Sequence, residues 1–367
     1  MSKKIRNIMV LILVAVWFAL AVWAWVIPSQ EISDAERRPL AQFPTLSAET
    51  VLSGKFSTDF ETYTLDQFPQ RDTWRTIKAL FHMNMLLQRD NNDIYVWNDS
   101  AAKMETDVNM DSVEHAKKHF TSLYDSYIKD TDCKVYFSIV PDKHYYMAEP
   151  SGHITMDYPA IFNEFKNLEW CEYIDLTKYM GSHIYYRTDT HWAQENIVSL
   201  AQGLCLFMNT DVMPNESEFA VETMSRPFYG VYYGQASLPI EPDTMNVIIS
   251  KFTDSAVVTD FETGKKLPVY NKDDLDNKDM YDYYLGGAKA ILTIDNPEAK
   301  TDRELILFRD SFGSSITPLM LESYKKITMI DTRYVHSSLI GKMVEFTDQD
   351  VLFLYSTSVL NNSFALK

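Results

Sequence analysis

The chain has 367 residues, of which 46% are hydrophobic and 23% charged, so its composition is that of a folded protein and excludes a disordered one. It carries 51 acidic and 34 basic side chains, a formal net charge of −17, and we therefore expect no binding to nucleic acid. Its three cysteines, Cys133, Cys171 and Cys205, lack metal-site spacing and exclude a disulfide scaffold, although a Cys133–Cys171 bridge stays open.

The amino terminus predicts a membrane anchor. Residues 8–27 contain no charge, and a helix of that length spans about 30 Å, the thickness of the hydrocarbon core of a bilayer. Lys3, Lys4 and Arg6 precede this segment, which predicts a cytoplasmic stub at 1–7 and export of the remainder. A cleaved signal peptide is the alternative, but its apolar region is normally about 7–15 residues long. We therefore predict an uncleaved, single-pass signal-anchor in the cell membrane.

The exported part begins with a linker at 28–50, rich in Pro, Ser and charges, and continues as one domain over 51–367. Apolar residues at helical spacing predict helices over 72–87 and 110–128. Short runs of β-branched and aromatic residues predict buried strands, separated in the carboxyl-terminal part by helical patterns; the strands are 134–140, 304–308, 326–331 and 350–355, and the helices 192–208 and 313–324. This alternation predicts an α/β fold with a mostly parallel sheet covered by helices on both faces.

The segment from about 210 to 290 has a different pattern. Residues 228–234, 245–250 and 256–270 read as strands joined by turns, with Gly264 in a hairpin. We expect a β-rich insertion in the α/β domain.

Residues 304–320 contain the first candidate for chemistry. A predicted strand is followed by the polar break Arg309–Asp310–Ser311 and then by a helical pattern. A serine at the carboxyl end of a strand can reach a cleft, and backbone N–H groups at the start of the next helix can stabilise an oxyanion. The alternative is that Asp310 or Ser311 only caps the helix.

The second candidate is the pair Asp189 and His191, just ahead of Trp192 and a helical pattern. A histidine can take the proton of a serine hydroxyl, and a carboxylate can fix its tautomer and balance the imidazolium. The alternative is a capping aspartate beside a packed histidine. No third or fourth ligand lies nearby for a metal ion. Together, the two segments supply the residue types of a catalytic triad.

Both motifs, TDTHW at 188–192 and RDSF at 309–312, occur in an order that resembles the SGNH-like acetyltransferases of exopolysaccharide biosynthesis. These include the AlgX and AlgJ alginate O-acetylation proteins and the bacterial DHHW-motif proteins. Other segments resemble the same family in their expected order, namely ERRPLAQFP (36–44), DQFPQRD (66–72), VPDKH (140–144) and YYLGG (283–287). The resemblance covers nearly the whole chain and implies an SGNH-hydrolase-like fold.

The resemblance also implies roles for individual residues. Ser311 corresponds to the nucleophile, with its backbone N–H as one oxyanion donor, His191 to the general base and acid, and Asp189 to the group that orients His191. Arg309 stands where ordinary SGNH hydrolases have a glycine, which would alter the turn or add a positive charge to the site. Thr190 stands where the DHHW name has histidine, as in the alginate-type proteins.

The remaining site residues are less defined. The other oxyanion donors cannot be matched; Gly286, Gly287 and Asn361 are candidates, and Gly286–Gly287 is equally well interpreted as a turn. Further substrate-binding candidates lie near the predicted strand ends or in the aromatic segment 228–234: Arg309, Asp310, Lys143, His144, Tyr232 and Tyr233. For Lys143 and His144 the alternative is a solvated loop, and for the aromatic residues it is the core.

These observations predict an extracytoplasmic O-acetyltransferase that uses an acetyl-serine intermediate and no bound cofactor. The resemblance implies a polysaccharide acceptor and a membrane-bound O-acyltransferase as the source of acetyl groups. Two alternatives stay open. One is a carbohydrate acetylesterase with the same triad and water as acceptor. The other is a non-catalytic polysaccharide-binding or assembly subunit.

Overall fold

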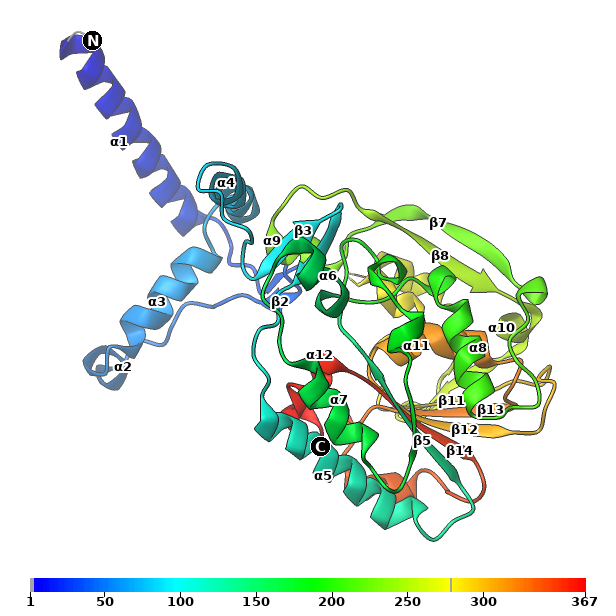
Figure 1. The fold of residues 1–367 in the computed structure, drawn as a ribbon. Coiled ribbons are helices and arrows are strands. Elements are labelled where there is room, and N and C mark those ends of the chain that lie inside the picture. Colours follow the sequence, from blue (N-terminus) through cyan, green and yellow to red (C-terminus); the bar gives the residue numbers. More distant parts are fainter. Residues whose placement is uncertain (1–2, 278) are drawn as a thin grey trace. The chain divides into compact units, whose positions relative to one another are not determined.

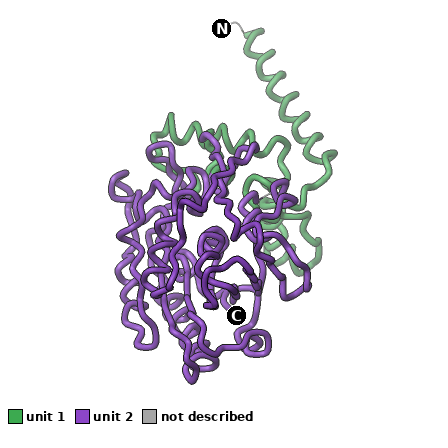
Figure 2. The backbone as a smooth tube through the Cα atoms, turned by 90° about the vertical axis from the view of Figure 1, so that its right-hand side faces the viewer, with its two compact units in different colours: residues 1–92, 233–239 green, residues 93–232, 240–367 purple. Residues whose placement is uncertain are grey.

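A computed structural model describes residues 3–277 and 279–367 (Figure 1). The chain divides into two compact units, coloured separately in Figure 2. Unit 1 comprises the residues up to Asn92 together with Tyr233–Pro239, and unit 2 comprises Asp93–Tyr232 and Ile240–Lys367. This division differs from the predicted boundary between residues 50 and 51. Glu36 of the predicted linker forms an ion pair with Arg71, so the linker packs with the helices that follow it and belongs to the same unit.

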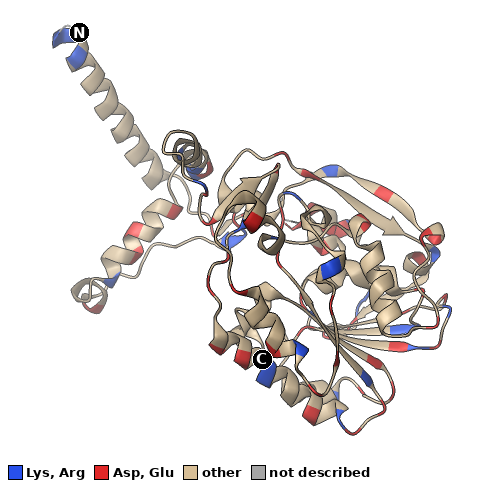
Figure 3. Ribbon diagram, in the orientation of Figure 1, with Lys and Arg blue, Asp and Glu red and all other residues tan. Residues whose placement is uncertain are grey.

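Unit 1 is helical. Its helices are α1 (Lys3–Val26), α2 (Ala48–Leu52), α3 (Lys55–Asp66) and α4 (Arg71–Asn84), and β1 (Ile32–Ser33) pairs antiparallel with β2 (Arg38–Pro39). Helix α1 has no buried residue and is long and apolar enough to cross a membrane. Figure 3 shows that the Lys and Arg residues of this helix lie at its amino-terminal end. The helix predicted over 72–87 is confirmed as α4.

Unit 2 is built on an eight-stranded sheet with the strand order β10-β9-β11-β13-β12-β14-β5-β6. The five strands from β13 to β6 run parallel, whereas β11, β9 and β10 add antiparallel at one edge. The predicted α/β fold with a mostly parallel sheet is therefore confirmed. The bounds are β5 (Lys134–Val140), β6 (Glu172–Ile174), β9 (Val257–Asp260), β10 (Lys266–Leu267), β11 (Ile291–Asp295), β12 (Glu304–Arg309), β13 (Lys326–Ile330) and β14 (Asp350–Ser356).

Helices cover both faces of this sheet, because alternate residues of the buried strands point to opposite sides (Figure 1). Leu307 and Leu352 face a core with α8 (Val198–Phe207), α10 (Lys251–Ser255) and α11 (Phe312–Ile316). Phe308 and Phe353 face the other core, with α5 (Met110–Leu123), α7 (Tyr158–Lys166) and α12 (Thr357–Leu360). The remaining elements of unit 2 are the hairpin β3 (Ile94–Trp97) and β4 (Ser100–Lys103) and helix α6 (His144–Ser151).

The predicted β-rich insertion is only partly present. Strands β7 (Ala220–Phe228) and β8 (Asp243–Ile249) form a separate antiparallel pair. The strands β9 and β10, predicted as part of the insertion, instead extend the main sheet. The strand predicted over 228–234 was wrong: β7 ends at Phe228, and α9 (Val231–Ala236) follows. All three cysteines are free, so the Cys133–Cys171 bridge is not formed.

Candidate active site

Ser311 lies at the carboxyl end of the central strand β12 and at the start of α11. The side chain of Asp310 holds this turn: its Oδ1 accepts the N–H of Phe312 at 3.0 Å, and its Oδ2 accepts the N–H of Ser356, at the end of β14, at 2.7 Å. The hydroxyl of Ser311 makes no capping bond with α11. Ser311 is therefore not a side-chain cap of α11, and its hydroxyl is left to contact His191.

That hydroxyl joins a continuous chain of hydrogen bonds with His191 and Asp189. Ser311 Oγ lies 2.7 Å from His191 Nε2, and His191 Nδ1 lies 2.6 Å from Asp189 Oδ1. Because a carboxylate only accepts, it assigns the proton to Nδ1 and leaves Nε2 to accept from the serine hydroxyl. Asp189 is fully buried, whereas Ser311 keeps partial exposure. The arrangement can remove the proton of a serine that an incoming acyl donor can reach.

Backbone and side-chain contacts fix the loop that carries Asp189. Asp189 Oδ1 accepts the backbone N–H of His191 at 3.0 Å, and its Oδ2 accepts that of Val231 at 2.8 Å. Asp243, at the start of β8, accepts the hydroxyl of Thr188 at 2.6 Å. The absence of a side chain at Gly230 allows this segment to lie close to the loop, since a Cβ there would lie 2.3 Å from the carbonyl oxygen of Thr188. The β7–α9 segment thus forms the backing of the loop.

Lys143 lies beneath the same loop. Its side chain is fully buried, and its Nζ donates to the carbonyl oxygens of Tyr186 at 2.5 Å and Arg187 at 2.9 Å, with that of Asp189 at 3.5 Å. Burial lowers the pKa of Lys143 to about 7, while the carboxylates of Asp243 and Asp189 act in the opposite direction. The structure therefore places Lys143 as a support for the loop backbone and excludes the solvated-loop alternative.

A tyrosine ring covers His191. The ring of Tyr281 stacks on the imidazole with a centroid distance of 3.9 Å and an interplanar angle of 9°. Its hydroxyl lies 2.7 Å from Ser315 Oγ, which also accepts the indole N–H of Trp192 at 2.7 Å. Burial raises the pKa of the Tyr281 phenol, so it stays neutral. An electron-rich face against the imidazole can stabilise the imidazolium that forms when His191 takes a proton.

The backbone N–H of Ser311 is available as an oxyanion donor, because no group in residues 3–277 and 279–367 accepts a hydrogen bond from it. The other candidates lie in different surroundings. Gly286 and Gly287 both have positive φ, at +72° and +75°, as in a turn. Asn361 binds backbone groups of Asp107 and Asn109 through its amide. Asn361 is therefore engaged with the segment that leads into α5, and the glycine pair forms a turn.

Arg309 does not add an exposed charge to the site. Its side chain is 1% exposed, with Nη1 at 3.7 Å from Asp331 Oδ2 and 3.4 Å from the carbonyl oxygen of Asp310. Burial lowers its pKa. The methylene groups of Arg309 occupy the space beside Gly313, where a Cβ would lie 2.8 Å from that of Arg309. Arg309 therefore packs beneath the turn that presents Ser311.

The remaining candidates for substrate binding are the aromatic residues of 228–234 and His144. Phe228 and Tyr232 are buried, at 1% and 7% exposure, so the core alternative holds for both. Tyr233 lies in α9 within the segment assigned to unit 1. His144 is buried, with Nδ1 at 2.9 Å from the hydroxyl of Tyr95 and Nε2 at 2.9 Å from the carbonyl oxygen of Ile154.

Several positioning residues have no signal in the sequence. Asp243 and Gly230 meet Thr188 across 55 and 42 residues, so only the fold brings them together. Tyr281 likewise reaches His191 from a distant part of the chain, and Ser315 is one of several small residues that follow Ser311. The sequence shows three tyrosines at 281, 283 and 284, but nothing in it distinguishes Tyr281 from the other two. Within the described residues, no group of three or more His, Cys, Asp or Glu side chains could hold a metal ion.

Comparisons with known proteins agree with the fold. Residues 157–330 match the protein family described as "DHHW protein", which confirms the predicted resemblance to DHHW-motif proteins. This region contains Asp189, His191 and Ser311. No curated protein sequence matches the chain.

Solved structures match most of the chain. A DHHW family protein from Eubacterium siraeum has 19% identity and a TM-score of 0.60, over 76% of this chain and 95% of that one. Bacillus cereus PatB1 has 18% identity and a TM-score of 0.60, over 73% and 96%. PatB1 with a sulfonyl adduct has 17% identity and a TM-score of 0.58, over 73% and 97%. At these identities the likeness establishes a shared fold.

Proposed function

We propose that this protein is a membrane-anchored extracytoplasmic O-acetyltransferase that transfers acetyl groups to hydroxyls of an exopolysaccharide or cell-wall polymer. The observation that carries the proposal is the continuous chain Ser311 Oγ–His191–Asp189, with links of 2.7 and 2.6 Å. A non-catalytic subunit has no need of this arrangement, which includes a buried carboxylate and a serine hydroxyl left unused by the adjoining helix.

The first half-reaction forms an acetyl-enzyme. Ser311 Oγ attacks the acetyl carbonyl carbon while its proton passes to His191 Nε2. Asp189 and the ring of Tyr281 stabilise the imidazolium, and the Ser311 N–H donates to the oxyanion. As the tetrahedral intermediate collapses, the bond to the donor's leaving group breaks, and that group takes the proton from His191. The products are acetyl-Ser311 and the free leaving group.

The second half-reaction transfers the acetyl group to sugar. His191 Nε2 takes the proton of a polysaccharide hydroxyl, whose oxygen attacks the carbonyl carbon of acetyl-Ser311. The bond to Ser311 Oγ breaks, and Oγ recovers the proton from His191. The sugar leaves as its acetyl ester, and the enzyme returns to its starting state. In the cell, a membrane-bound O-acyltransferase would supply the acetyl groups on the exported side.

The test is acetyl transfer from a small activated acetyl ester to an oligosaccharide by the full-length protein in detergent. Acetyl-oligosaccharide and free acetate are measured together, with and without acceptor. We expect the acceptor to increase total turnover and to receive the larger share of acetyl. Ser311→Ala removes the activity, whereas Ser314→Ala, a change of the same size three residues along α11, retains it.

Two results separate this proposal from its alternatives. If acetate remains the main product and the acceptor does not change turnover, the protein is an acetylesterase with the same triad. If wild type and Ser311→Ala both fail to turn over the ester, the catalytic proposal is contradicted, and a polysaccharide-binding subunit becomes the better account.

A further inference from the structure

Helix α4 of unit 1 exposes an apolar stripe. Four large apolar residues follow one another at intervals of three or four along the helix and its carboxyl-terminal cap: Trp74 (47% exposed), Ile77 (51%), Phe81 (51%) and Met85 (71%). Residues three and four apart lie on the same side of a helix. We call these four residues the α4 stripe.

The side of α4 that packs within unit 1 is polar. Arg71 and Arg75 both form ion pairs with Glu36, and Ala79 is the only residue of α4 that is fully buried. An amphipathic helix of a soluble protein normally does the reverse, placing its apolar side on the core and its charges in water. The α4 stripe therefore indicates an apolar partner outside unit 1.

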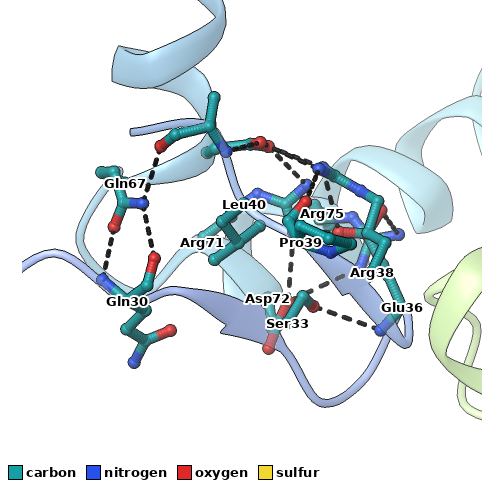
Figure 4. A network of polar contacts seen from close by, with 12 residues as sticks. Gln30, Ser33, Glu36, Arg38, Pro39, Leu40, Gln67, Arg71, Asp72 and Arg75 are labelled. Atoms are coloured by element: carbon teal, nitrogen blue, oxygen red, sulfur yellow. Dashed lines mark hydrogen bonds and ion pairs between the residues drawn. The ribbon is translucent and has the colours of Figure 1, made fainter. Parts of the chain in front are cut away.

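Hydrogen bonds join the segment that follows α1 to the segment that precedes α4, between Gln30 and Gln67 (Figure 4). The backbone N–H of Gln30 donates to Gln67 Oε1 at 2.8 Å, and Gln67 Nε2 donates back to the carbonyl oxygen of Gln30 at 2.8 Å. Gln30 lies four residues after the last residue of α1, and Gln67 four residues before the first of α4. Each of these two four-residue segments extends at most about 14 Å, so together they allow at most about 28 Å in addition to the Gln30–Gln67 bonds. The start of α4 is thus tied to the point where α1 would leave a membrane.

The ion pairs drawn in Figure 4 strengthen this link. Asp66, at the end of α3, accepts two bonds from Arg38 at 2.6 and 2.9 Å and the backbone N–H of Ala41 at 2.9 Å. Arg71, the first residue of α4, also contacts Asp66, at 3.3 Å. The segment that follows α1 therefore contacts the junction of α3 and α4 at two points, through Gln30 and through Arg38.

The exposed side of α4 also carries a cation. Arg71 and Arg75 are partly buried and paired with Glu36, Asp66 and Asp72, so they add no net charge to that side. Lys78 is exposed and follows Ile77 directly, at the border of the α4 stripe. Aromatic and apolar side chains beside exposed cations are the composition of helices that lie in the headgroup region of a bilayer.

We propose that α4 lies on the outer surface of the phospholipid bilayer that α1 spans, with the α4 stripe inserted among the lipids. This inference rests on the proposed membrane anchor and adds a second, interfacial contact to it. A single spanning helix leaves the exported part free to turn about its tether. Two contacts joined by the Gln30–Gln67 bonds would hold unit 1 in one orientation at the lipid surface.

The test places a photo-crosslinking amino acid, p-benzoylphenylalanine, at Trp74 or Phe81 in the full-length protein, reconstituted in phosphatidylcholine–phosphatidylglycerol vesicles. The matched control is the same substitution at Phe261 of unit 2, whose exposure of 47% equals that of Trp74. After irradiation, mass spectrometry identifies the crosslinked partner. We expect lipid adducts at 74 and 81 at several times the yield at 261, with unchanged thermal unfolding.

The remaining outcomes contradict the inference in distinguishable ways. Equal lipid yield at all three positions, or no adduct at 74 and 81, overturns it while α1 stays inserted, as shown by vesicle flotation at alkaline pH. Crosslinks at 74 and 81 to another copy of the chain, or to a different protein in native membranes, assign the α4 stripe to a protein partner instead. Failure of the protein to float with vesicles contradicts the anchor and this inference together.

Discussion

Replacement of Gly230 by alanine tests how the triad is held in place while Asp189, His191 and Ser311 all remain unsubstituted. A Cβ at Gly230 would lie 2.3 Å from the carbonyl oxygen of Thr188 and 2.4 Å from Cβ of Asp189. Ordinary van der Waals contact begins near 3.4 Å. The neighbours that would be struck are backbone and the root of a side chain, so a change of rotamer cannot relieve the contact.

The size of the effect follows from these distances. The two segments must separate by about 1.1 Å, the difference between 3.4 and 2.3 Å. The segment that moves carries Asp189, whose Oδ2 bond to the N–H of Val231 and Oδ1 bond to His191 measure 2.8 and 2.6 Å. A misplacement of about 1 Å costs about 10²-fold in rate, equivalent to about 2.7 kcal/mol in the activation barrier.

The assay is kcat/KM for an activated acetyl ester, measured beside the free energy of unfolding in denaturant. We expect Gly230→Ala to lose about 10²-fold in kcat/KM while the protein stays folded. The matched control is Gly203→Ala in the middle of α8, where a Cβ meets nothing within 4 Å. That change should stabilise the fold by about 0.5–1 kcal/mol and leave kcat/KM unchanged. Wild-type kcat/KM in folded Gly230→Ala would refute the reasoning.

Three further predictions concern single side chains. Asp189→Asn should lower kcat by about 10³-fold or more with little change in KM, because an amide neither fixes the Nδ1–H tautomer of His191 nor balances the imidazolium; a loss below tenfold would contradict this role. Tyr281→Phe keeps the ring on His191 and should lose less than about tenfold in kcat, whereas Tyr281→Leu removes the ring and should lose more; equal losses would assign the effect to the hydroxyl bond with Ser315. The hydrogen bonds from Arg38 lower the pKa of Asp66 from 3.8 to about 2, so its contribution to the stability of unit 1 is complete above pH 3.8 and is lost as the pH falls through 2. Amide exchange in α3 and α4 should therefore accelerate over that range, and Asp66→Asn should exchange fast at every pH.

Local patterns were sufficient to predict the sheet. The strand predicted over 134–140 agrees with β5 in both bounds, and 304–308, 326–331 and 350–355 agree with β12, β13 and β14 to within one residue. Buried parallel strands are apolar without interruption, so their signal is strong. The two motifs also predicted the catalytic pair, with His191 ahead of a helical pattern and Ser311 just after a buried strand. In the structure, His191 Nε2 lies 2.7 Å from Ser311 Oγ.

The segment 228–234 shows where local patterns are insufficient. Its alternating aromatic residues predicted a strand, but the chain ends β7 at Phe228 and turns into α9. The turn allows Gly230 to approach Thr188 and lets the N–H of Val231 reach Asp189, 42 residues earlier. Tertiary contacts determine the backbone conformation of this segment. They outweigh its intrinsic strand propensity, which amounts to about 1 kcal/mol.

The same reasoning explains the polar contacts that were not predicted. Asp243 meets Thr188 across 55 residues, and Gln30 meets Gln67 across 37. A carboxylate or an amide has no periodicity by which its partner could be found in a single sequence. Lys143 was predicted to bind substrate or to lie in a solvated loop, and Arg309 to alter the turn or add a positive charge to the site. Both are buried, because their ammonium and guanidinium groups find carbonyl oxygens or a carboxylate only after the sheet has formed.

The central claim is that Ser311 forms an ester with the transferred acetyl group. The most direct measurement is peptide mass mapping of the full-length protein after brief incubation with an isotopically labelled, activated acetyl ester and an acid quench. We predict one labelled acetyl group per chain on the peptide that contains Ser311, absent in Ser311→Ala and strongly delayed in His191→Ala. Label on another residue, or turnover of the ester without any labelled Ser311, would contradict the account.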